Sequence, residues 1–399
     1  MKKLKLICTH CGEKYDIESI YFRCSHCNEP LELEEVQSGR INQTAHLKQT
    51  MMERYQDFFP FLEIDSSFSL GEGFTPLIPS RIAKEDLNIN NLYFKNETVN
   101  PTWSFKDRGT VVGMQHAIKL GYKKIGTVST GNMAVSVAAY GSRAGLETFV
   151  FVDKNIAPEK LNPIAIHKPH LIKVDGNYGD LYYETLEIGK EKDIYFINSD
   201  QPYRVEGSKA IAFEICEQLN FVVPDYVVVP TSAGGNIRGI EKGFREFKNA
   251  GLIDKLPKII CAQASGCSPI YNAFITEKDT ISRIEHPNTI AHAIENPYPP
   301  SGNEVLRMVK KNDSLCVAVT DEEIIHAQAQ LAKEGLFGQP ASAVPLAAVK
   351  KLKESGRIKE SDHIVCIVTG SGLKYTSALE KHHLTSLEAK MENLRDFLK

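Results

Sequence analysis

Short runs rich in Val, Ile and Phe alternate with amphipathic runs along most of this 399-residue chain. Strands are predicted over residues 123–130, 147–153, 170–176, 193–199, 225–230, 258–264, 314–320 and 363–372. Helices are predicted over 131–146, 180–191, 208–219, 236–248 and 321–335. Because apolar strands separated by helices are typical of parallel sheets covered on both faces, we expect an α/β fold with two doubly wound sheets and a cleft between them.

The remaining segments are predicted to connect or flank these units. Residues 39–69 look like a linker with a helical piece over 46–62, and the glycines and prolines of 69–80 predict a turn-rich loop. The last stretch, 386–399, has the pattern of a short amphipathic helix.

Four of the nine cysteines lie in the first 27 residues, as the pairs CTHC and CSHC: Cys8, Cys11, Cys24 and Cys27. Two such turns separated by a hairpin, here predicted over 15–23, place four thiolates at the corners of a tetrahedron. Structural zinc sites use that geometry, so we expect a zinc ribbon. Thiols without metal, or a histidine (His10 or His26) in place of one cysteine, are the alternatives.

Composition narrows the possible partners. A formal net charge of -3, with an acidic stretch after the cysteine pairs, argues against nucleic acid. No run of about 18 apolar residues predicts a membrane span, and the N-terminus lacks the apolar part of a secretion signal. The other cysteines have no disulfide spacing, which favours a reducing, cytoplasmic setting: Cys216, Cys261, Cys267, Cys316 and Cys366.

Three glycine-rich turns follow predicted strands and are expected to open helices: Ser129–Met133, Pro230–Ile237 and Val368–Gly372. Ligands of α/β proteins bind at such strand ends. Backbone N–H groups of residues 232–236, at a helix N-terminus, suit a phosphate dianion. The turn has neither the Gly-Lys-Ser/Thr ending of a nucleotide P-loop nor the glycine spacing of a dinucleotide site.

Lys106 is predicted to begin a helix, in the run SFKDRG. The helix dipole and the nearby Arg108 both favour a neutral amine there, and Trp103 and Phe105 suggest a partly buried setting. A neutral lysine amine is a nucleophile that forms a Schiff base with an aldehyde cofactor. A solvated surface lysine is the alternative interpretation.

The run NPTWSFKDRG resembles the NPTGSFKDRG of threonine synthases, in the fold type II family of pyridoxal-phosphate enzymes. STGNMAVSVAAYGSRAGL is similar to that family's STGNTAASAAAYAARAGL, and NSDQPYRVEGSK to its Asn-Ser…Arg-x-Glu-Gly segment. EGLFGQPASAVPLAAV resembles EGIFAEPASAA, and VTGSGLK resembles VTGHGLK. The resemblance extends over roughly residues 8–380, and an N-terminal cysteine ribbon occurs in many members.

The resemblance implies roles for particular residues. Lys106 would bind pyridoxal 5'-phosphate and shuttle protons, Asn132 would contact its 3-hydroxyl, and Thr369 its ring nitrogen. Its phosphate would lie on the backbone of Ser232, Ala233, Gly234, Gly235 and Asn236. The substrate carboxylate would bind Ser129 and Thr130. The substrate phosphate would bind Asn198, Ser199 and Arg204, a set in which a guanidinium suits a phosphate leaving group.

It also implies an organisation of the chain. We expect a zinc ribbon at 1–36, a large cofactor domain at 37–104 with 201–385, a small domain at 105–200 and a helical tail at 386–399. Members of the family are commonly homodimers, and the sequence itself carries no signature for or against a dimer.

The implied activity is that of a carbon–oxygen lyase. It would remove phosphate from O-phospho-L-homoserine by β,γ-elimination and add water to give L-threonine. The alternatives are a related enzyme acting on O-phosphoserine by β-replacement, as cysteate synthases do, an ammonia-lyase acting on threonine or serine, and an inactive fold that serves as a binding module.

Three positions depart from the family pattern. Trp103 stands where the family has glycine, and Met133 where it has a threonine that helps to hold the substrate phosphate. The cofactor cup reads SAGGN instead of GNAGN or GNGGN. Trp103 is expected either to pack between domains or to reshape the substrate pocket.

Overall fold

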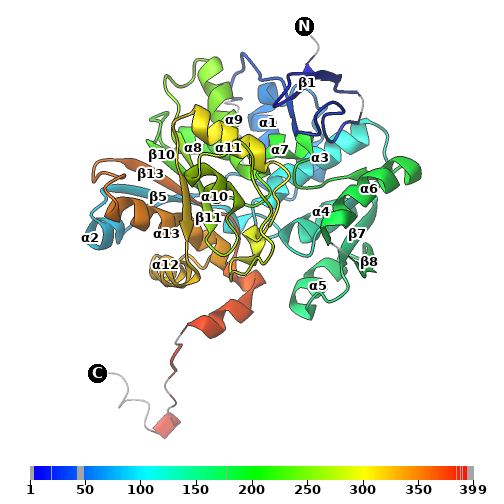
Figure 1. Cartoon of the computed structure of the whole chain (residues 1–399). Coiled ribbons are helices and arrows are strands. Elements are labelled where there is room, and N and C mark those ends of the chain that lie inside the picture. Colours follow the sequence, from blue (N-terminus) through cyan, green and yellow to red (C-terminus); the bar gives the residue numbers. More distant parts are fainter. Residues whose placement is uncertain are drawn as a thin grey trace.

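The computed structural model describes residues 4–18, 20–42, 49–176, 178–382, 384–386, 388 and 390–392. Its strands form three sheets, and the expected α/β architecture with parallel sheets is confirmed (Figure 1). The sheets divide among the three parts of the chain expected from the sequence. Where one domain ends and the next begins stays a prediction.

The N-terminal sheet is small and antiparallel, with strand order β2-β1-β3. Its strands are β1 (Lys5–Cys8), β2 (Lys14–Asp16) and β3 (Leu31–Leu33). The prediction of a hairpin within 15–23 is wrong, because β2 pairs back onto β1 and the chain then continues to β3. We call residues 4–36 the cysteine ribbon.

The cysteine ribbon is anchored to the body through buried cations of α9 (Gly235–Asn249). Arg238 donates to the carbonyl of Leu31 at 3.1 Å, and Lys242 donates to the carbonyl of Leu33 at 2.6 Å. Both cations are buried and also bond to the body, Arg238 to Ser301 and Lys242 to Glu206, so the ribbon backbone completes their hydrogen bonding. Figure 1 shows the ribbon, in dark blue, beside α1, α7 and α9.

The largest sheet has six strands in the order β12-β11-β10-β13-β5-β4. The first five are parallel: β12 (Cys316–Val319), β11 (Lys258–Ala264), β10 (Tyr226–Pro230), β13 (His363–Val368) and β5 (Asn91–Asn96). The edge strand β4 (Leu77–Pro79) is antiparallel to β5. The segment predicted as a loop over 69–80 therefore ends in a strand.

The second parallel sheet has the order β8-β7-β6-β9. Its strands are β8 (His170–Val174), β7 (Glu147–Asp153), β6 (Lys124–Val128) and β9 (Tyr195–Phe196). β9 is shorter than the predicted 193–199. Val128 donates its N–H to the side-chain oxygen of Asn198 at 3.0 Å. This side-chain bond replaces the next backbone hydrogen bond between β6 and β9.

Both faces of the six-stranded sheet are covered. Val227 and Val229 of β10 pack in one core cluster with α8 (Ala210–Gln218) and α9, while Val228 packs in a second cluster with α13 (Pro340–Glu354). This alternation follows from the period of two in a strand. It explains why the strands read as continuous apolar runs in the sequence.

The remaining helices are α1 (Met51–Arg54), α2 (Ala83–Leu87), α3 (Lys106–Lys119), α4 (Asn132–Arg143), α5 (Pro158–Ala165), α6 (Tyr178–Lys192), α7 (Pro202–Ser208), α10 (Pro269–Ile275), α11 (Gly302–Lys311) and α12 (Asp321–Lys333). Short 3-10 helices lie at Gln56–Phe58, Ser66–Phe68, Glu97–Val99, His292–Ile294, Gly372–Lys374 and Thr376–Lys381.

The predicted helices are present, with two qualifications. The turn Val368–Gly372 leads only into a 3-10 helix, so the expectation that it opens a longer helix is wrong. The helical piece over 46–62 is confirmed in part by α1, and its first three residues lie outside the described residues. Most of the predicted tail helix, 386–399, also lies outside them. Among the described residues, no helix is both long and apolar enough to cross a membrane.

Candidate active site

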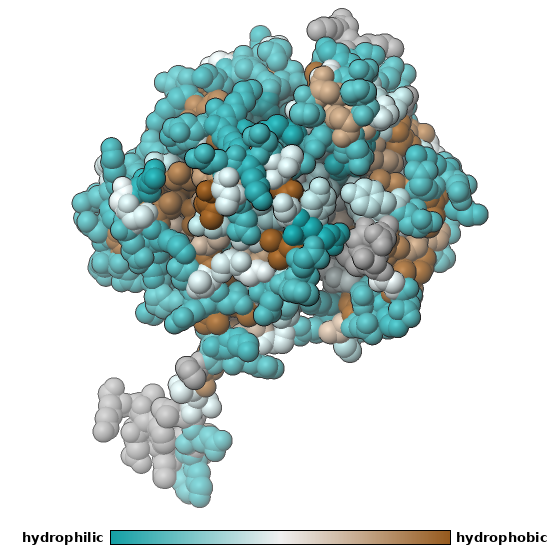
Figure 2. All heavy atoms as spheres, in the orientation of Figure 1, coloured by the Kyte–Doolittle hydropathy of each residue, from teal (hydrophilic) through white to brown (hydrophobic). Residues whose placement is uncertain are grey.

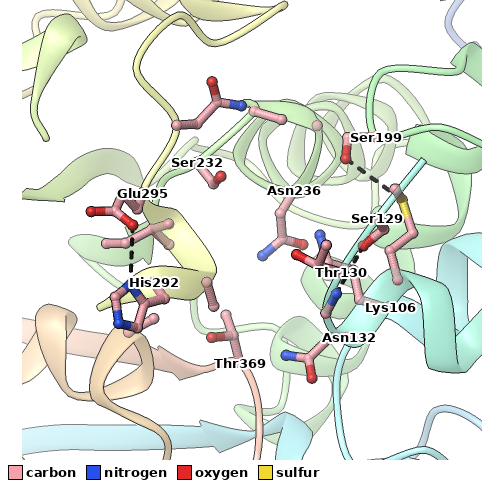
Figure 3. A pocket seen from close by; sticks show the side chains of 18 of the residues that line it. Lys106, Ser129, Thr130, Asn132, Ser199, Ser232, Asn236, His292, Glu295 and Thr369 are labelled. Atoms are coloured by element: carbon pink, nitrogen blue, oxygen red, sulfur yellow. Dashed lines mark hydrogen bonds and ion pairs between the residues drawn. The ribbon is translucent and has the colours of Figure 1, made fainter. Parts of the chain in front are cut away.

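A cavity of about 590 Å³ lies where the carboxyl ends of β6, β10 and β13 meet the N-termini of α3, α4 and α9. Every site residue singled out from the sequence outside the cysteine ribbon lines this cavity: Lys106, Ser129, Thr130, Asn132, Asn198, Ser199, Arg204, Ser232, Ala233, Gly234, Gly235, Asn236 and Thr369. In Figure 3, Lys106, Ser129, Thr130 and Asn132 line one side, and His292 and Glu295 the opposite side.

The backbone before Lys106 is fastened to the end of β13. Phe105 donates its N–H to the carbonyl of Thr369 at 3.0 Å, and Ser371 donates to the carbonyl of Trp103 at 3.0 Å. These two bonds bring the first residue of α3 beside the turn after β13. Lys106 and Thr369, far apart in the sequence, therefore line the same cavity.

The surroundings of Lys106 favour a neutral amine. Burial holds its pKa well below the ordinary value of a lysine, and the positive charges of Arg204 and Lys374 lower the pKa further. Its Nζ lies 4.5 Å from the centre of the Phe105 ring. Among the described residues it has no hydrogen-bond or ion-pair partner, so the amine is available as a nucleophile or base.

The expectation that Arg108 contributes to this shift is wrong. The Arg108 guanidinium points away from the cavity and is fully paired, with Glu97 at 2.6 Å and Glu214 at 2.6 Å. All three side chains are buried. Arg108 therefore fixes α3 to α8 and to the turn after β5, and the cations that affect Lys106 are others.

The turn between β10 and α9 forms the expected cup. Gly234 has φ of +95°, a conformation that side chains rarely adopt, and a Cβ there would come within 2.8 Å of Ser301. A Cβ on Gly235 would lie 2.5 Å from the carbonyl oxygen of Ser199. Both glycines are therefore required for the close approach of the cup to its neighbours. The first turn of α9 leaves backbone N–H groups free for an anion.

Buried polar atoms without partners face this cup. Neither the side-chain oxygen nor the side-chain nitrogen of Asn236 has a hydrogen-bond partner among the described residues. Asn236 projects into the pocket in Figure 3. Since buried polar groups are nearly always paired in native proteins, this asparagine is suited to contact a polar ligand.

A second group of unpartnered donors lies at Asn198 and Arg204. Asn198 Nδ2 and Arg204 Nε and Nη2 are buried and have no partner among the described residues. Burial lowers the pKa of Arg204 to about 10, so the guanidinium still carries its charge at neutral pH. Arg204 Nη1 donates to the carbonyl of Ser199 at 3.4 Å, which leaves the other two nitrogens for a ligand. A charged guanidinium with two such donors, beside the Asn198 amide nitrogen, is suited to an anion such as phosphate.

Asn132 and Thr369 are held by residues that the sequence analysis did not assign to the site. Asn132 Nδ2 donates to Gln339 Oε1 at 3.3 Å, and the Thr369 hydroxyl lies 3.2 Å from the hydroxyl of Ser342. Gln339 and Ser342 belong to the run QPAS at the start of α13. Pro340 at the first helical position was the available signal for that helix start.

Lys374, Tyr182, His292 and Glu295 also line the cavity and were not anticipated. Lys374 Nζ donates to the carbonyl of Thr102 at 2.8 Å, and burial lowers its pKa to about 8. It stands in VTGSGLK, where the glycines drew attention and the lysine did not. His292 and Glu295 are paired at 3.0 Å in a segment with no glycine-rich pattern.

Two of the three departures from the family pattern, Trp103 and Met133, differ in position. Trp103 is 51% exposed and does not line the cavity, so neither packing between domains nor a reshaped pocket is supported. Met133 lines the cavity, and the Ser199 hydroxyl lies 3.6 Å from its sulfur (Figure 3). Met133 is thus the departure that can change what binds.

The four cysteines of the ribbon come together as expected. The Sγ atoms of Cys8, Cys11, Cys24 and Cys27 all lie within 4.8 Å of one another. The Cys8–Cys27 and Cys11–Cys24 sulfur distances are 3.4 and 3.6 Å, close to the roughly 3.8 Å edge of a tetrahedral site with 2.3 Å metal–sulfur bonds. His10 and His26 are not part of the cluster, so the histidine alternative is not supported.

Comparison with known proteins gives a consistent result. The family model described as pyridoxal-phosphate dependent enzyme matches residues 68–370. A threonine synthase of Methanocaldococcus jannaschii is 40% identical over 98% of this chain and 98% of its own length. A threonine synthase of a Bacillus species is 37% identical over 88% of this chain and 97% of its own.

Solved structures with the same fold are more distant in sequence. A threonine deaminase isoform from Solanum lycopersicum gives a TM-score of 0.65 at 21% identity, covering 78% of this chain and 88% of that one. Maize serine racemase gives 0.65 at 24% identity, covering 78% and 94%. At this identity the likeness concerns the fold alone.

Proposed function

The chain belongs to the family of pyridoxal-phosphate-dependent enzymes, and we propose that it acts as a threonine synthase on O-phospho-L-homoserine. The reaction converts this phosphate ester and water into L-threonine and phosphate. Curated threonine synthases that are 35–40% identical over most of the chain support the activity. The substrate and the roles of the residues are argued below from the site.

The residues of the cavity fit the cofactor. The glycine cup with its free N–H groups matches a phosphate, the unpartnered Asn236 offers a polar contact beside it, and the neutral amine of Lys106 matches an aldehyde. Asn132 and the hydroxyl of Thr369 then hold the two polar edges of the ring. When bound, pyridoxal phosphate supplies an electrophilic carbon for the substrate amine and a conjugated system that accepts the electron pair released at Cα.

The chain's own residues orient the substrate and move its protons. Ser129 and Thr130, before the N-terminus of α4, hold the substrate carboxylate. Lys106, as a neutral amine, accepts the proton from Cα and then the proton lost from Cβ. The negative charge of the leaving phosphate at Cγ is received by Arg204 with Asn198 and Ser199. A proton returned at Cγ completes the methyl group, water adds its oxygen at Cβ, and a proton returned at Cα completes threonine.

The observation that carries the substrate assignment is the charged Arg204 beside Asn198: Arg204 Nε and Nη2 and Asn198 Nδ2 are buried donors without partners among the described residues. An amino acid without a phosphate would leave both groups buried and unsatisfied, at a cost of several kcal/mol. The cavity therefore favours a phosphorylated substrate over threonine or serine.

The test is an assay of the cofactor-loaded protein with O-phosphohomoserine, following threonine and phosphate together. We expect equal amounts of both products, and none from Lys106→Ala. Loss of only the Arg204 contact, in Arg204→Met, is expected to raise KM by more than roughly tenfold. If neither product forms while the cofactor is bound, the substrate assignment is wrong. The next substrates to test are then O-phosphoserine with sulfite, followed by threonine and serine. O-phosphoserine comes first because Met133 departs from the family pattern in this cavity.

For the cysteine cluster we propose a structural zinc ion. Four cysteine thiolates with the spacing of a tetrahedral site are characteristic of zinc, and a site closed by four protein ligands leaves no position for a substrate. A site of reduced cysteines also supports a cytoplasmic location.

A homodimer is the proposed assembly. Apolar side chains are exposed on neighbouring loops near Lys106: Leu70, Phe74, Val99, Trp103 and Leu373. The N–H of Gly73 donates to Asn100, and Ser371 to Trp103, which ties these loops together. On the face drawn in Figure 2, hydrophilic residues predominate and hydrophobic ones lie in separate patches. Light scattering that gives the mass of a single chain at micromolar concentration would exclude the dimer.

A further inference from the structure

The cysteine ribbon reaches the wall of the substrate cavity through one side chain, Arg23. Its guanidinium is only 11% exposed and donates from all three nitrogens. Nη1 donates to Asp200 Oδ2 at 2.6 Å, Nη2 to the carbonyl of Pro300 at 3.1 Å, and Nε to the carbonyl of Asn28 in the ribbon itself at 2.7 Å. One residue thus joins the ribbon to two other parts of the chain.

Both of those parts belong to the wall of the cavity. Asp200 stands between Ser199 and Arg204, two residues that line the cavity, and Pro300 itself lines the cavity. The residue after Pro300, Ser301, donates its N–H to the carbonyl of Ala233 in the glycine cup at 3.1 Å. Arg23 therefore contacts the expected substrate-phosphate segment and the loop that supports the cup.

Asp200 depends on Arg23 for its counter-ion. The carboxylate is 1% exposed, and Arg23 is its only ion-pair partner among the described residues. Its second oxygen accepts a hydrogen bond from the hydroxyl of Tyr182, which lines the cavity from α6. A buried carboxylate without a cation is strongly unfavourable. In the absence of Arg23, Asp200 would therefore form an ion pair with another cation.

The candidate is Arg204, four residues further along the same segment. Asp200 already acts electrostatically on Arg204, whose Nε and Nη2 have no partner among the described residues. If Asp200 turned to Arg204, the guanidinium would be neutralised and drawn away from the anion that it is placed to receive. Arg23 prevents this because it already forms an ion pair with Asp200 from the cysteine ribbon.

We propose that Arg23 of the cysteine ribbon is a positioning residue for the phosphate subsite, and that it keeps Arg204 free by pairing with Asp200. This inference rests on the proposed function for the identity of the substrate. It assigns the ribbon a part in substrate binding in addition to its metal site. Arg23 touches no substrate itself and acts only through Arg204, so its loss is expected to weaken phosphate binding more than it slows the chemical step.

The experiment compares Arg23→Gln with Glu29→Gln in the holoenzyme. Glu29 is on the same ribbon and pairs with Arg307 at 2.7 Å and Asn303 at 3.0 Å, and none of these residues lines the cavity. Arg23→Gln is expected to raise both KM for O-phosphohomoserine and the inhibition constant of inorganic phosphate at least roughly tenfold, with kcat within about threefold. Glu29→Gln is expected to change none of them by more than about twofold.

Two further variants separate positioning from general loss of structure. Arg23→Lys keeps the charge but cannot form three bonds in a plane, so it should restore part of the affinity. In Arg23→Gln with Asp200→Asn, no buried carboxylate remains to capture Arg204, so the affinity should be higher than in Arg23→Gln alone. A double variant that is no better than Arg23→Gln alone would overturn the proposal.

Hydrogen exchange of residues 198–204 needs no substrate and tests the inference separately from the reaction. Faster exchange is expected in Arg23→Gln than in the wild type or Glu29→Gln. Equal exchange and equal phosphate affinity in the two variants would refute the role of Arg23. A wild type that neither binds phosphate nor releases it from O-phosphohomoserine would instead refute the proposed function, while the exchange comparison would still decide the role of Arg23.

Discussion

At the scale of single residues, Trp103 shows how a substitution beside the nucleophile can leave the pocket unchanged. Its φ is +62°, in the left-handed region where glycine has no steric penalty and other residues lose roughly 1–2 kcal/mol. This conformation explains why the resembled family has glycine at the position. The tryptophan ring lies outside the cavity and exposed, so the substitution affects the backbone rather than the substrate.

Trp103→Gly is accordingly expected to leave KM for O-phosphohomoserine within about twofold of the wild-type value. The relief of the left-handed strain is partly offset by the larger freedom of glycine in the unfolded chain, so the free energy of unfolding should change by less than about 1 kcal/mol. Steady-state kinetics and urea unfolding check both values. A large change in KM would mean that the ring contacts the substrate.

Met133 is expected to behave differently, because it lies in the cavity against Ser199. Met133→Thr places a hydroxyl beside the phosphate subsite, and one hydrogen bond of about 1 kcal/mol corresponds to roughly a fivefold lower KM. Met133→Val is the matched control, since valine has the shape of threonine without its hydroxyl. Equal KM values in the two variants would contradict the expected contact.

At the scale of elements, the crossing of α3 and α7 sets the distance between the lysine and the phosphate subsite. A Cβ on Gly207 of α7 would lie 2.0 Å from the carbonyl oxygen of Arg108 on α3, and one on Gly109 would lie 2.5 Å from that of Arg204. The two helices therefore touch backbone to backbone. The glycines of SFKDRG and RVEGS are needed for this contact, which brings Lys106 and Arg204 to one cavity.

Gly207→Ala should consequently reduce the free energy of unfolding by roughly 3 kcal/mol or more, because the clash is with backbone that cannot move aside. Gly176→Ala is the control, since a Cβ there meets nothing within 4 Å. Urea unfolding of both variants tests the difference. A Gly207→Ala protein as stable as Gly176→Ala would show that the helices can separate without loss.

The same crossing contains a buried histidine. His116 of α3 stacks on Tyr203 of α7 with ring centres 3.4 Å apart, and its Nδ1 lies 2.8 Å from the Tyr195 hydroxyl. Burial lowers its pKa from 6.5 to about 3, so the folded state holds it neutral where the unfolded chain would bind a proton. This contribution to stability is complete above pH 6.5 and is lost as the pH falls toward 3.

Relative to His116→Gln, which does not titrate, the wild type should therefore lose up to roughly 5 kcal/mol of stability between pH 6.5 and 3. Urea unfolding of both proteins at several pH values measures this difference. Parallel pH profiles would mean that His116 is protonated in the folded protein.

At the scale of the whole molecule, the sequence predicted the strands from β6 to β13 and three turns of the cavity, because strand ends and glycine turns are local signals. Asn198, Ser199 and Arg204 came from the family resemblance instead. It did not predict α7, whose N-cap Gln201 is set by tertiary contacts, nor α13, whose Pro345 is unusual inside a helix. The partners of Arg108 could not be inferred either, since Glu97 and Glu214 reach it only through the fold. Because Arg108 is close to Lys106 in the sequence, it was expected to lower the pKa of Lys106. Burial and the charges of Arg204 and Lys374 lower that pKa instead.

Metal removal should affect the whole protein. We expect about one zinc per chain, and a lower Tm after its removal by a chelator, since metal-bound folding of the ribbon is lost. Cys24→Ser should lose the metal, whereas Cys216→Ser, a buried cysteine outside the cluster, should retain it. Metal analysis and thermal unfolding test this. Protein purified without chelator that contains no metal would contradict the site.

The two bonds from Arg238 and Lys242 to the carbonyls of Leu31 and Leu33 also bear on how such a chain can evolve. Deleting the ribbon from a gene would remove one carbonyl acceptor from each cation and expose the face that the ribbon covers, while Lys242 keeps its pair with Glu206 and Arg238 its bond to Ser301. Loss of the ribbon therefore removes the reason for a cation that reaches a ribbon carbonyl at positions 238 and 242. In lineages whose enzymes begin directly at the cofactor domain, these two positions are expected to differ from those of lineages that keep the ribbon, and to have changed together with its disappearance.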